Sequence, residues 1–110
     1  MMDDIAMGVI EPVLPNEPSH WCVRMVIVTK KDGSPRRTVD FQGLNNAAKR
    51  QTRHTIPPFQ QVSRVPRSTW KSVVDCWYGY HPVSVRPEDR EYLTFITPFG
   101  RFRYIRAPQG

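Results

Sequence analysis

The residue types best suited to chemistry gather around Asp75, at the end of an apolar run. Residues 71–75 read KSVVD, and a glycine-containing turn, CWYGYH, follows at residues 76–81. A carboxylate at such a place most commonly caps the turn that follows it. Beside exposed turn amides it can also hold Mg²⁺, because this ion takes one or two carboxylates and completes its shell with phosphate oxygens. The residues alone leave both roles open.

A second group of candidates is cationic and lies at the tip of a predicted β-hairpin. Residues 24–29 and 36–41 are predicted strands, and DGSP at residues 32–35 is the turn between them. The tip carries Lys30, Lys31, Arg36 and Arg37. Cations at a turn usually keep a sheet edge soluble, but a basic tip can also close over a phosphate chain.

Four further residues are ambiguous when taken singly. Tyr80 is typical of a core tyrosine with a satisfied hydroxyl, and Gln109, between a proline and a glycine, is typical of a turn. His54 and His81 have no Ser or Cys nucleophile pattern beside them. A catalytic histidine is therefore not expected.

The scaffold predicted for these residues is α+β and led by antiparallel strands. The predicted helical pieces are residues 3–10, where Ile5, Val9 and Ile10 have near-helical spacing and Pro12 ends the helix, one turn at 44–49, and residues 59–65. A loop is expected at residues 15–18, and residues 87–90 are a turn or a single helical turn. The predicted strands are residues 24–29, 36–41, 70–76, 93–97 and 101–106, and residues 83–85 are extended. Residues 98–100 join the last two strands as a second hairpin. Adjacent valines at positions 73 and 74 indicate that the strand at 70–76 is buried on both faces.

Charge is distributed unevenly along the 110 residues, whose formal net charge is +6. Residues 1–20 carry four acids and no Lys or Arg, a net −4, whereas residues 24–71 carry eleven Lys and Arg against two acids, a net +9. The remaining residues 72–110 carry a net +1. The basic segment is either a solvated surface or a surface that faces nucleic-acid phosphates, and charge alone does not separate the two.

Composition excludes several classes of protein. No apolar run approaches the roughly 20 residues of a membrane span, so no membrane partner is expected. The acidic N-terminus lacks the features of a signal peptide, which favours an intracellular protein that is not secreted. Cys22 and Cys76 have no metal-ligand spacing around them, so reduced cysteines and no zinc are expected.

Six motifs follow one another in a fixed order along the chain. They are GVIEP at 8–12 with Trp21, KKDGS at 30–34, Arg36 with VDF at 39–41 and LN at 44–45, the Asp75 turn ending in GYH, TFITPFGRF at 94–102, and APQG at 107–110. In this order and approximate spacing they resemble the reverse transcriptases of retroelements, with the gypsy-type LTR retrotransposons as the closest fit. The resemblance covers nearly the whole chain, and the six motifs together are more specific than any one.

The resemblance implies a fragment of an RNA-directed DNA polymerase with an incomplete right-hand fold. Residues 1–70 would be fingers, and residues 71–110 the start of the palm and the return to the fingers. Asp75 would be the first carboxylate that binds the two catalytic Mg²⁺ ions, with Mn²⁺ as a possible substitute. The partners implied are an RNA or DNA template-primer, a deoxynucleoside triphosphate, and the palm, thumb and RNase H of a longer polyprotein.

The resemblance also assigns contacts residue by residue. The nucleotide would be bound by Lys30 or Lys31, Arg36, Tyr80 and Gln109, and template phosphates by Lys49, Arg50 and Arg53. The tyrosine would stand against the 2′-hydroxyl, the group that separates RNA from DNA precursors.

The chain departs from the family pattern at four positions and lacks one motif. The four are Pro35, Gln42, Cys76 and Pro82. The second carboxylate motif, Tyr-x-Asp-Asp, is expected beyond Gly110, so the chain by itself is not expected to polymerise. An intact polyprotein, in a cytoplasmic particle or the nucleus, is one hypothesis. A degenerate or domesticated remnant that binds nucleic acid without catalysis is the other.

Overall fold

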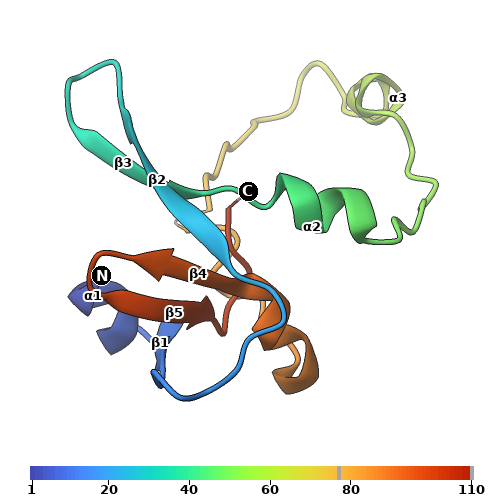
Figure 1. Ribbon diagram of the computed structural model, residues 1–110. Helices are drawn as coiled ribbons and strands as arrows, with labels where there is room; N and C mark the ends of the chain where they lie inside the picture. The colour runs from blue at the N-terminus through green and yellow to red at the C-terminus, as the bar shows by residue number, and fades with distance from the viewer. Residues whose placement is uncertain (77, 110) are drawn as a thin grey trace.

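A five-stranded mixed sheet organises the computed structural model, which describes residues 1–76 and 78–109 (Figure 1). The strand order is β1-β5-β4-β2-β3. The strands are β1 (Ile10–Val13), β2 (Val23–Thr29), β3 (Pro35–Val39), β4 (Thr94–Thr97) and β5 (Gly100–Tyr104). Short helices accompany them: α1 (Met2–Ala6), α2 (Gln42–Ala47), α3 (Pro58–Ser63) and the 3₁₀ helix η1 (Pro87–Leu93). The α+β class is confirmed.

The N-terminal helix is shorter than the sequence predicts. The prediction extends it to Ile10, but α1 ends at Ala6 and Gly8 takes a φ of +63°, a conformation that glycine adopts without strain. Ile10 instead begins β1, where it pairs with Tyr104 of β5. Val9 and Ile10 are buried, so the apolar spacing correctly marks core residues although it wrongly predicts a helix for them.

The two predicted hairpins are confirmed, but the sheet is not purely antiparallel. β2 pairs antiparallel with β3, and β4 pairs antiparallel with β5. β2 then joins the second hairpin in parallel, with Val23 opposite Phe95. This pairing leaves β3 as an edge strand, and the outer part of the β2–β3 hairpin projects past the other strands (Figure 1).

The tip of the first hairpin is held by its own turn. The Lys30 amide donates to the Ser34 carbonyl at 2.9 Å, and Gly33 takes a φ of +81°. Asp32 Oδ1 accepts hydrogen bonds from the Ser34 amide and hydroxyl at 2.9 and 2.6 Å. These bonds favour the ionised carboxylate and hold the pKa of Asp32 below its usual value.

The core is formed by residues of β1, β3, β4 and β5 and by residues next to them, and it is rich in aromatic side chains. Its buried members are Val9, Ile10, Val39, Phe41, Phe95 and Phe102. Tyr104 packs against this cluster, with its ring centroid 5.2 Å from that of Phe95 and 6.1 Å from that of Phe41.

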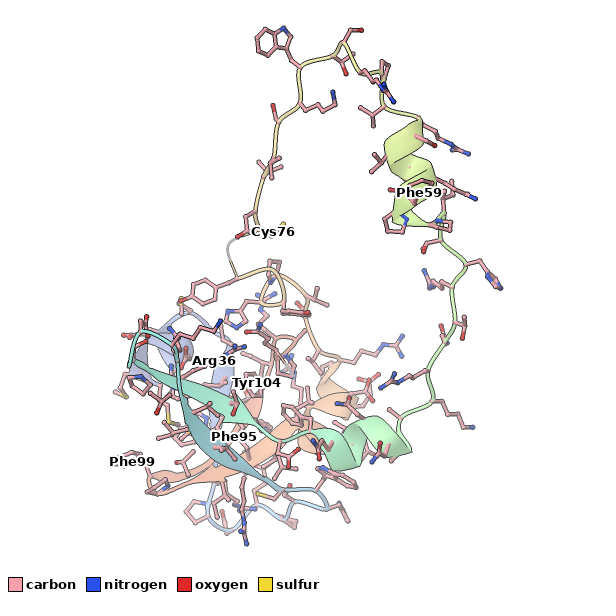
Figure 2. All side chains as sticks on the ribbon, turned by 90° about the horizontal axis from the view of Figure 1, so that it is seen from above. Arg36, Phe59, Cys76, Phe95, Phe99 and Tyr104 are labelled. Carbon is pink, nitrogen blue, oxygen red and sulfur yellow. The ribbon has the colours of Figure 1, made fainter. Side chains whose placement is uncertain are left out.

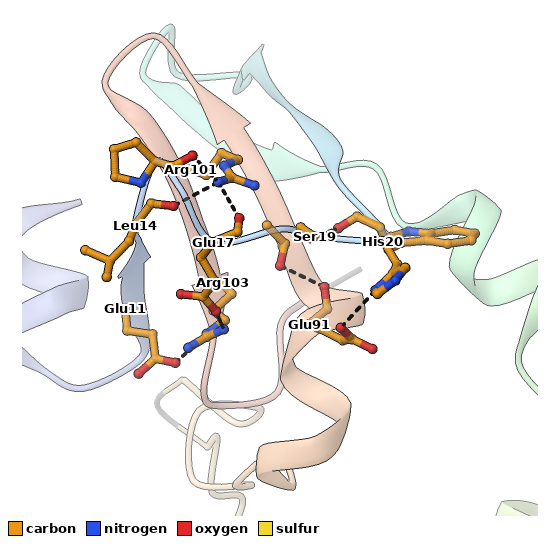
Figure 3. Close-up of polar contacts among 11 residues, drawn as sticks. Glu11, Leu14, Glu17, Ser19, His20, Glu91, Arg101 and Arg103 are labelled. Atoms are coloured by element: carbon orange, nitrogen blue, oxygen red, sulfur yellow. Dashed lines mark hydrogen bonds and ion pairs between the residues drawn. The ribbon is translucent and has the colours of Figure 1, made fainter.

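Two arginines of β5 tie the loop after β1 to the sheet (Figure 3). Arg103 donates to Glu11 at 2.6 Å and also to Glu17, which raises the pKa of its guanidinium. Arg101 Nη2 donates to three carbonyls, those of Leu14, Pro15 and Glu17, at 2.8, 3.1 and 2.7 Å. The loop predicted at residues 15–18 is therefore held to the sheet by hydrogen bonds from two arginine side chains.

Residues 48–76 leave the sheet as a wide excursion that carries α3 (Figure 2). The predicted strand at 70–76 does not form: these residues have no regular structure. Trp70, Val73 and Val74 are almost fully exposed, at 104, 97 and 93%. An apolar strand needs a paired neighbour and cover on both faces, and no described strand lies beside this segment to supply them.

Candidate functional site

A groove of about 540 Å³ lies between the β2–β3 hairpin, α1, the turn after Asp75 and the C-terminal residues. Consecutive residues 35–39 line it, so it runs along the edge strand β3. Its apolar wall is made by Val9, Ile10, Met25, Val39, Phe95 and Tyr104. Its polar wall is made by Asp4, Lys30, Arg36, Arg37, Thr38, His81 and Gln109. An apolar, aromatic wall facing cations suits a ligand with a flat ring and an anionic group.

The cations of the groove come from the hairpin. Lys30 ends the first arm of the hairpin, while Arg36 and Arg37 lie on β3, opposite Val28 and Ile27 of β2. Among the described residues, the Lys30 and Arg36 side chains form no ion pair, whereas Arg37 Nη1 lies 2.8 Å from Asp4 Oδ2. Two cations are therefore available to an anion in the groove, and the third is paired.

The opposite side of the groove is built by the turn after Asp75. Tyr78 and His81 stack with ring centroids 4.9 Å apart and planes 11° from parallel. The turn is closed by the His81 amide, which donates to the Tyr78 carbonyl at 2.9 Å. Tyr78 has a φ of +50°, an uncommon backbone conformation for a residue with a side chain.

Backbone bonds place Gln109 beside this turn. The Ala107 amide donates to the Val83 carbonyl at 2.8 Å, and the Val85 amide donates to the Ile105 carbonyl at 3.1 Å. These bonds hold the segment leading to Gln109 against the residues that follow the turn. Residues far apart in sequence thus line one groove.

Tyr104 lies in the groove wall under the charged pair. Burial of its hydroxyl is the main cause of a raised pKa, and the nearby Asp4 carboxylate raises it further. Arg37 acts in the opposite direction and lowers the pKa of Tyr104.

Three of the five predicted nucleotide-binding residues line this groove. They are Lys30, Arg36 and Gln109. Lys31 and Tyr80 are exposed and are not part of its lining. The predicted template contacts Lys49, Arg50 and Arg53 lie on the excursion, where all three are exposed.

Asp75 is not a groove residue. It is exposed and follows the unstructured segment instead of ending a strand. Among the described residues, no group of three or more His, Cys, Asp and Glu side chains is placed to hold a metal ion. Asp75 alone offers one carboxylate, and the part of the chain that the structure describes does not make a metal centre.

For several groove residues the sequence predicts no functional role. Arg37 is predicted at the hairpin tip, but the sequence does not predict that it contacts the nucleotide. Successive side chains of a strand point to opposite faces, so the pattern of β3 does not predict that Arg36 and Arg37 line the same groove. Asp4 and Tyr104 lie in no motif, and Tyr78 lies in the Asp75 turn without an assigned role. His81 belongs to one of the six motifs, yet the sequence assigns it no role, since a catalytic histidine is not expected.

Comparison with known proteins points to a mobile genetic element. The chain is similar over its full length to the Transposon Tf2-3, Tf2-4 and Tf2-5 polyproteins of Schizosaccharomyces pombe, with 29% identity over 111 residues in each case. It spans 8% of the length of these polyproteins. No protein-family model matches the chain, and none of the described helices has the length and apolar character to cross a membrane. The similarity supports a segment of a retrotransposon polyprotein.

Proposed function

We propose that the chain is the fingers and the beginning of the palm of a gypsy-type reverse transcriptase, and that its groove binds the incoming nucleotide. The observation that carries this proposal is the shared position of Lys30, Arg36 and Gln109 in one groove. The resemblance assigns these three to the nucleotide, among five residues in all, independently of any geometry. The similarity to retrotransposon polyproteins supports the same assignment.

The groove has the chemistry that a nucleoside triphosphate needs. Lys30 supplies a point charge and Arg36 a planar guanidinium, the two ways in which proteins bind phosphate. The stacked Tyr78 and His81 rings and the Tyr104 wall offer aromatic surface to a base or sugar. The Gln109 amide can both donate to and accept from the sugar hydroxyl.

We do not expect the 110-residue chain to carry out the metal-dependent part of the reaction by itself. In the complete polymerase, Asp75 would contribute one ligand to Mg²⁺, which would then neutralise charge on the phosphates. Because the described residues bring no second carboxylate to Asp75, we expect the 110-residue chain to bind nucleotide without extending a primer. Primer extension with Mg²⁺ or Mn²⁺ measures this directly.

Variants of the hairpin cations test the groove. Binding of a deoxynucleoside triphosphate to the purified chain, followed by calorimetry, should weaken about tenfold in Lys30→Ala and Arg36→Ala, since each removes a bond to a charged group. Lys31→Ala is the matched control, because this neighbouring lysine lies outside the groove lining. Equal losses in Lys30→Ala and Lys31→Ala would mean that net charge, and not the groove, binds the ligand.

A further inference from the structure

One of the three groove cations already has an anion. Arg37 Nη1 lies 2.8 Å from Asp4 Oδ2, and both residues line the groove. Both side chains remain accessible, with exposed fractions of 45% for Arg37 and 21% for Asp4. A ligand in the groove can therefore reach the pair from solvent.

The position of Asp4 is unfavourable for an anionic ligand. A carboxylate on the wall of a cationic groove repels phosphate, and it also occupies the guanidinium that would otherwise bind it. The opposite effects of Asp4 and Arg37 on the pKa of Tyr104 place both charges against the same wall. A ligand in the groove would therefore lie next to the Asp4–Arg37 pair.

Loss of Arg37 as a partner leaves the Asp4 carboxylate in contact with solvent, because its side chain is 21% exposed. Asp4 lies on α1, a helix of five residues. No side-chain cap stabilises the N-terminus of this helix. Release of Arg37 is therefore less costly than unpairing a fully buried carboxylate would be.

We propose that Asp4 is an internal competitor for the groove: it pairs with Arg37 in the empty groove, and a polyphosphate ligand displaces it. The identity of the ligand as a nucleotide polyphosphate rests on the proposed function. The competition itself rests on the pair and on its place in the groove. It makes α1 a regulator of ligand affinity, since anything that draws α1 away from β3 exposes a third cation.

The test compares two adjacent acids on one helix. Inorganic tripolyphosphate is titrated into the wild-type chain, Asp4→Asn and Asp3→Asn. Asp3 is exposed and lies outside the groove, so its variant makes the same change in net charge without touching Arg37. We expect Asp4→Asn to bind about fivefold more tightly than Asp3→Asn, at the lower end of typical coupling between sites.

A double variant separates competition from general charge. In an Arg37→Ala background, Asp4→Asn should gain no more affinity than Asp3→Asn does, because the competed cation is gone. Equal affinities of the two single variants, or weaker binding by Asp4→Asn, would overturn the competition and leave the proposed nucleotide groove intact. Absence of tripolyphosphate binding in every variant would instead overturn both.

A measurement on the wild-type chain does not depend on the variants folding. Saturating tripolyphosphate should speed amide hydrogen exchange at Ile5 of α1 and at Met7, which caps this helix, because Arg37 no longer anchors the helix. Slower or unchanged exchange at these amides would contradict displacement of Asp4.

Discussion

The sheet with its groove and the excursion at residues 48–76 both carry large apolar side chains, yet only the sheet buries them. Phe95 in β4 is 2% exposed, whereas Phe59 in α3 is 86% exposed. The two regions differ in what surrounds them: β4 has a strand on each side, whereas none of the residues of α3 is buried. An apolar residue stabilises this chain only where a second element meets it.

The largest expected loss of stability follows removal of the buried Phe95, and the exposed Phe59 is its control. Phe95→Ala should lower the free energy of unfolding by about 3–5 kcal/mol, the usual cost of emptying a buried aromatic site. Phe59→Ala should change it by less than about 0.5 kcal/mol, as at other surface positions. Urea denaturation followed by circular dichroism measures both, and comparable losses would show that α3 is packed in solution.

A smaller loss of stability is expected when the hydrogen bonds from β5 to β1 and to the loop after β1 are removed. Arg103→Met removes the bonds to Glu11 and Glu17 and should cost about 1–3 kcal/mol, because both acceptors are charged. Arg24→Met, on exposed β2 and without an acidic partner among the described residues, is the control. The same denaturation assay applies, and a double-mutant cycle with Glu11→Gln isolates the pair. A coupling near zero would remove the structural role of this bond.

The excursion should instead reveal itself in binding to nucleic acid. Replacing Lys49, Arg50 and Arg53 by Gln should reduce the slope of log affinity against log salt for single-stranded oligonucleotides by about 2, because each neutralised phosphate contributes roughly 0.7 to that slope. Unfolding stability should not change, since all three side chains are exposed. Arg86→Gln, an exposed cation outside the +9 segment, serves as the control. An unchanged slope in the triple variant would exclude residues 49–53 as a phosphate-binding segment.

The smallest effect concerns the groove wall and appears only at alkaline pH. The raised pKa of Tyr104 means that the folded chain favours the neutral phenol. Its contribution to stability is complete below the pKa of the unfolded chain, near 10, and is lost as pH rises through the higher folded value. Tyr104→Phe should therefore lose less stability than wild type between neutral pH and pH 11. Parallel pH profiles of the two proteins would contradict this.

Local sequence was sufficient where the elements are hairpins. The turn residues Asp32, Gly33 and Gly100 predict both antiparallel hairpins, since turn chemistry acts over a few residues. Long-range pairing is not predictable in the same way. The start of β1 is predicted as helix because Ile5, Val9 and Ile10 fit helical spacing, and only the partner strand β5 decides that Ile10 is extended.

The same division holds for the candidate site. The sequence by itself determined which residue types are present, with motifs naming Lys30, Arg36, Gln109 and Asp75. Tertiary structure decided which of them meet: hairpin and C-terminal segment converge on a groove, while Asp75 stays outside it. It also decided that Arg37 is held by Asp4, an ion pair across 33 residues of sequence. Turn and strand preferences are local, whereas a binding groove depends on backbone pairings between distant segments, and local periodicity does not say which segments pair.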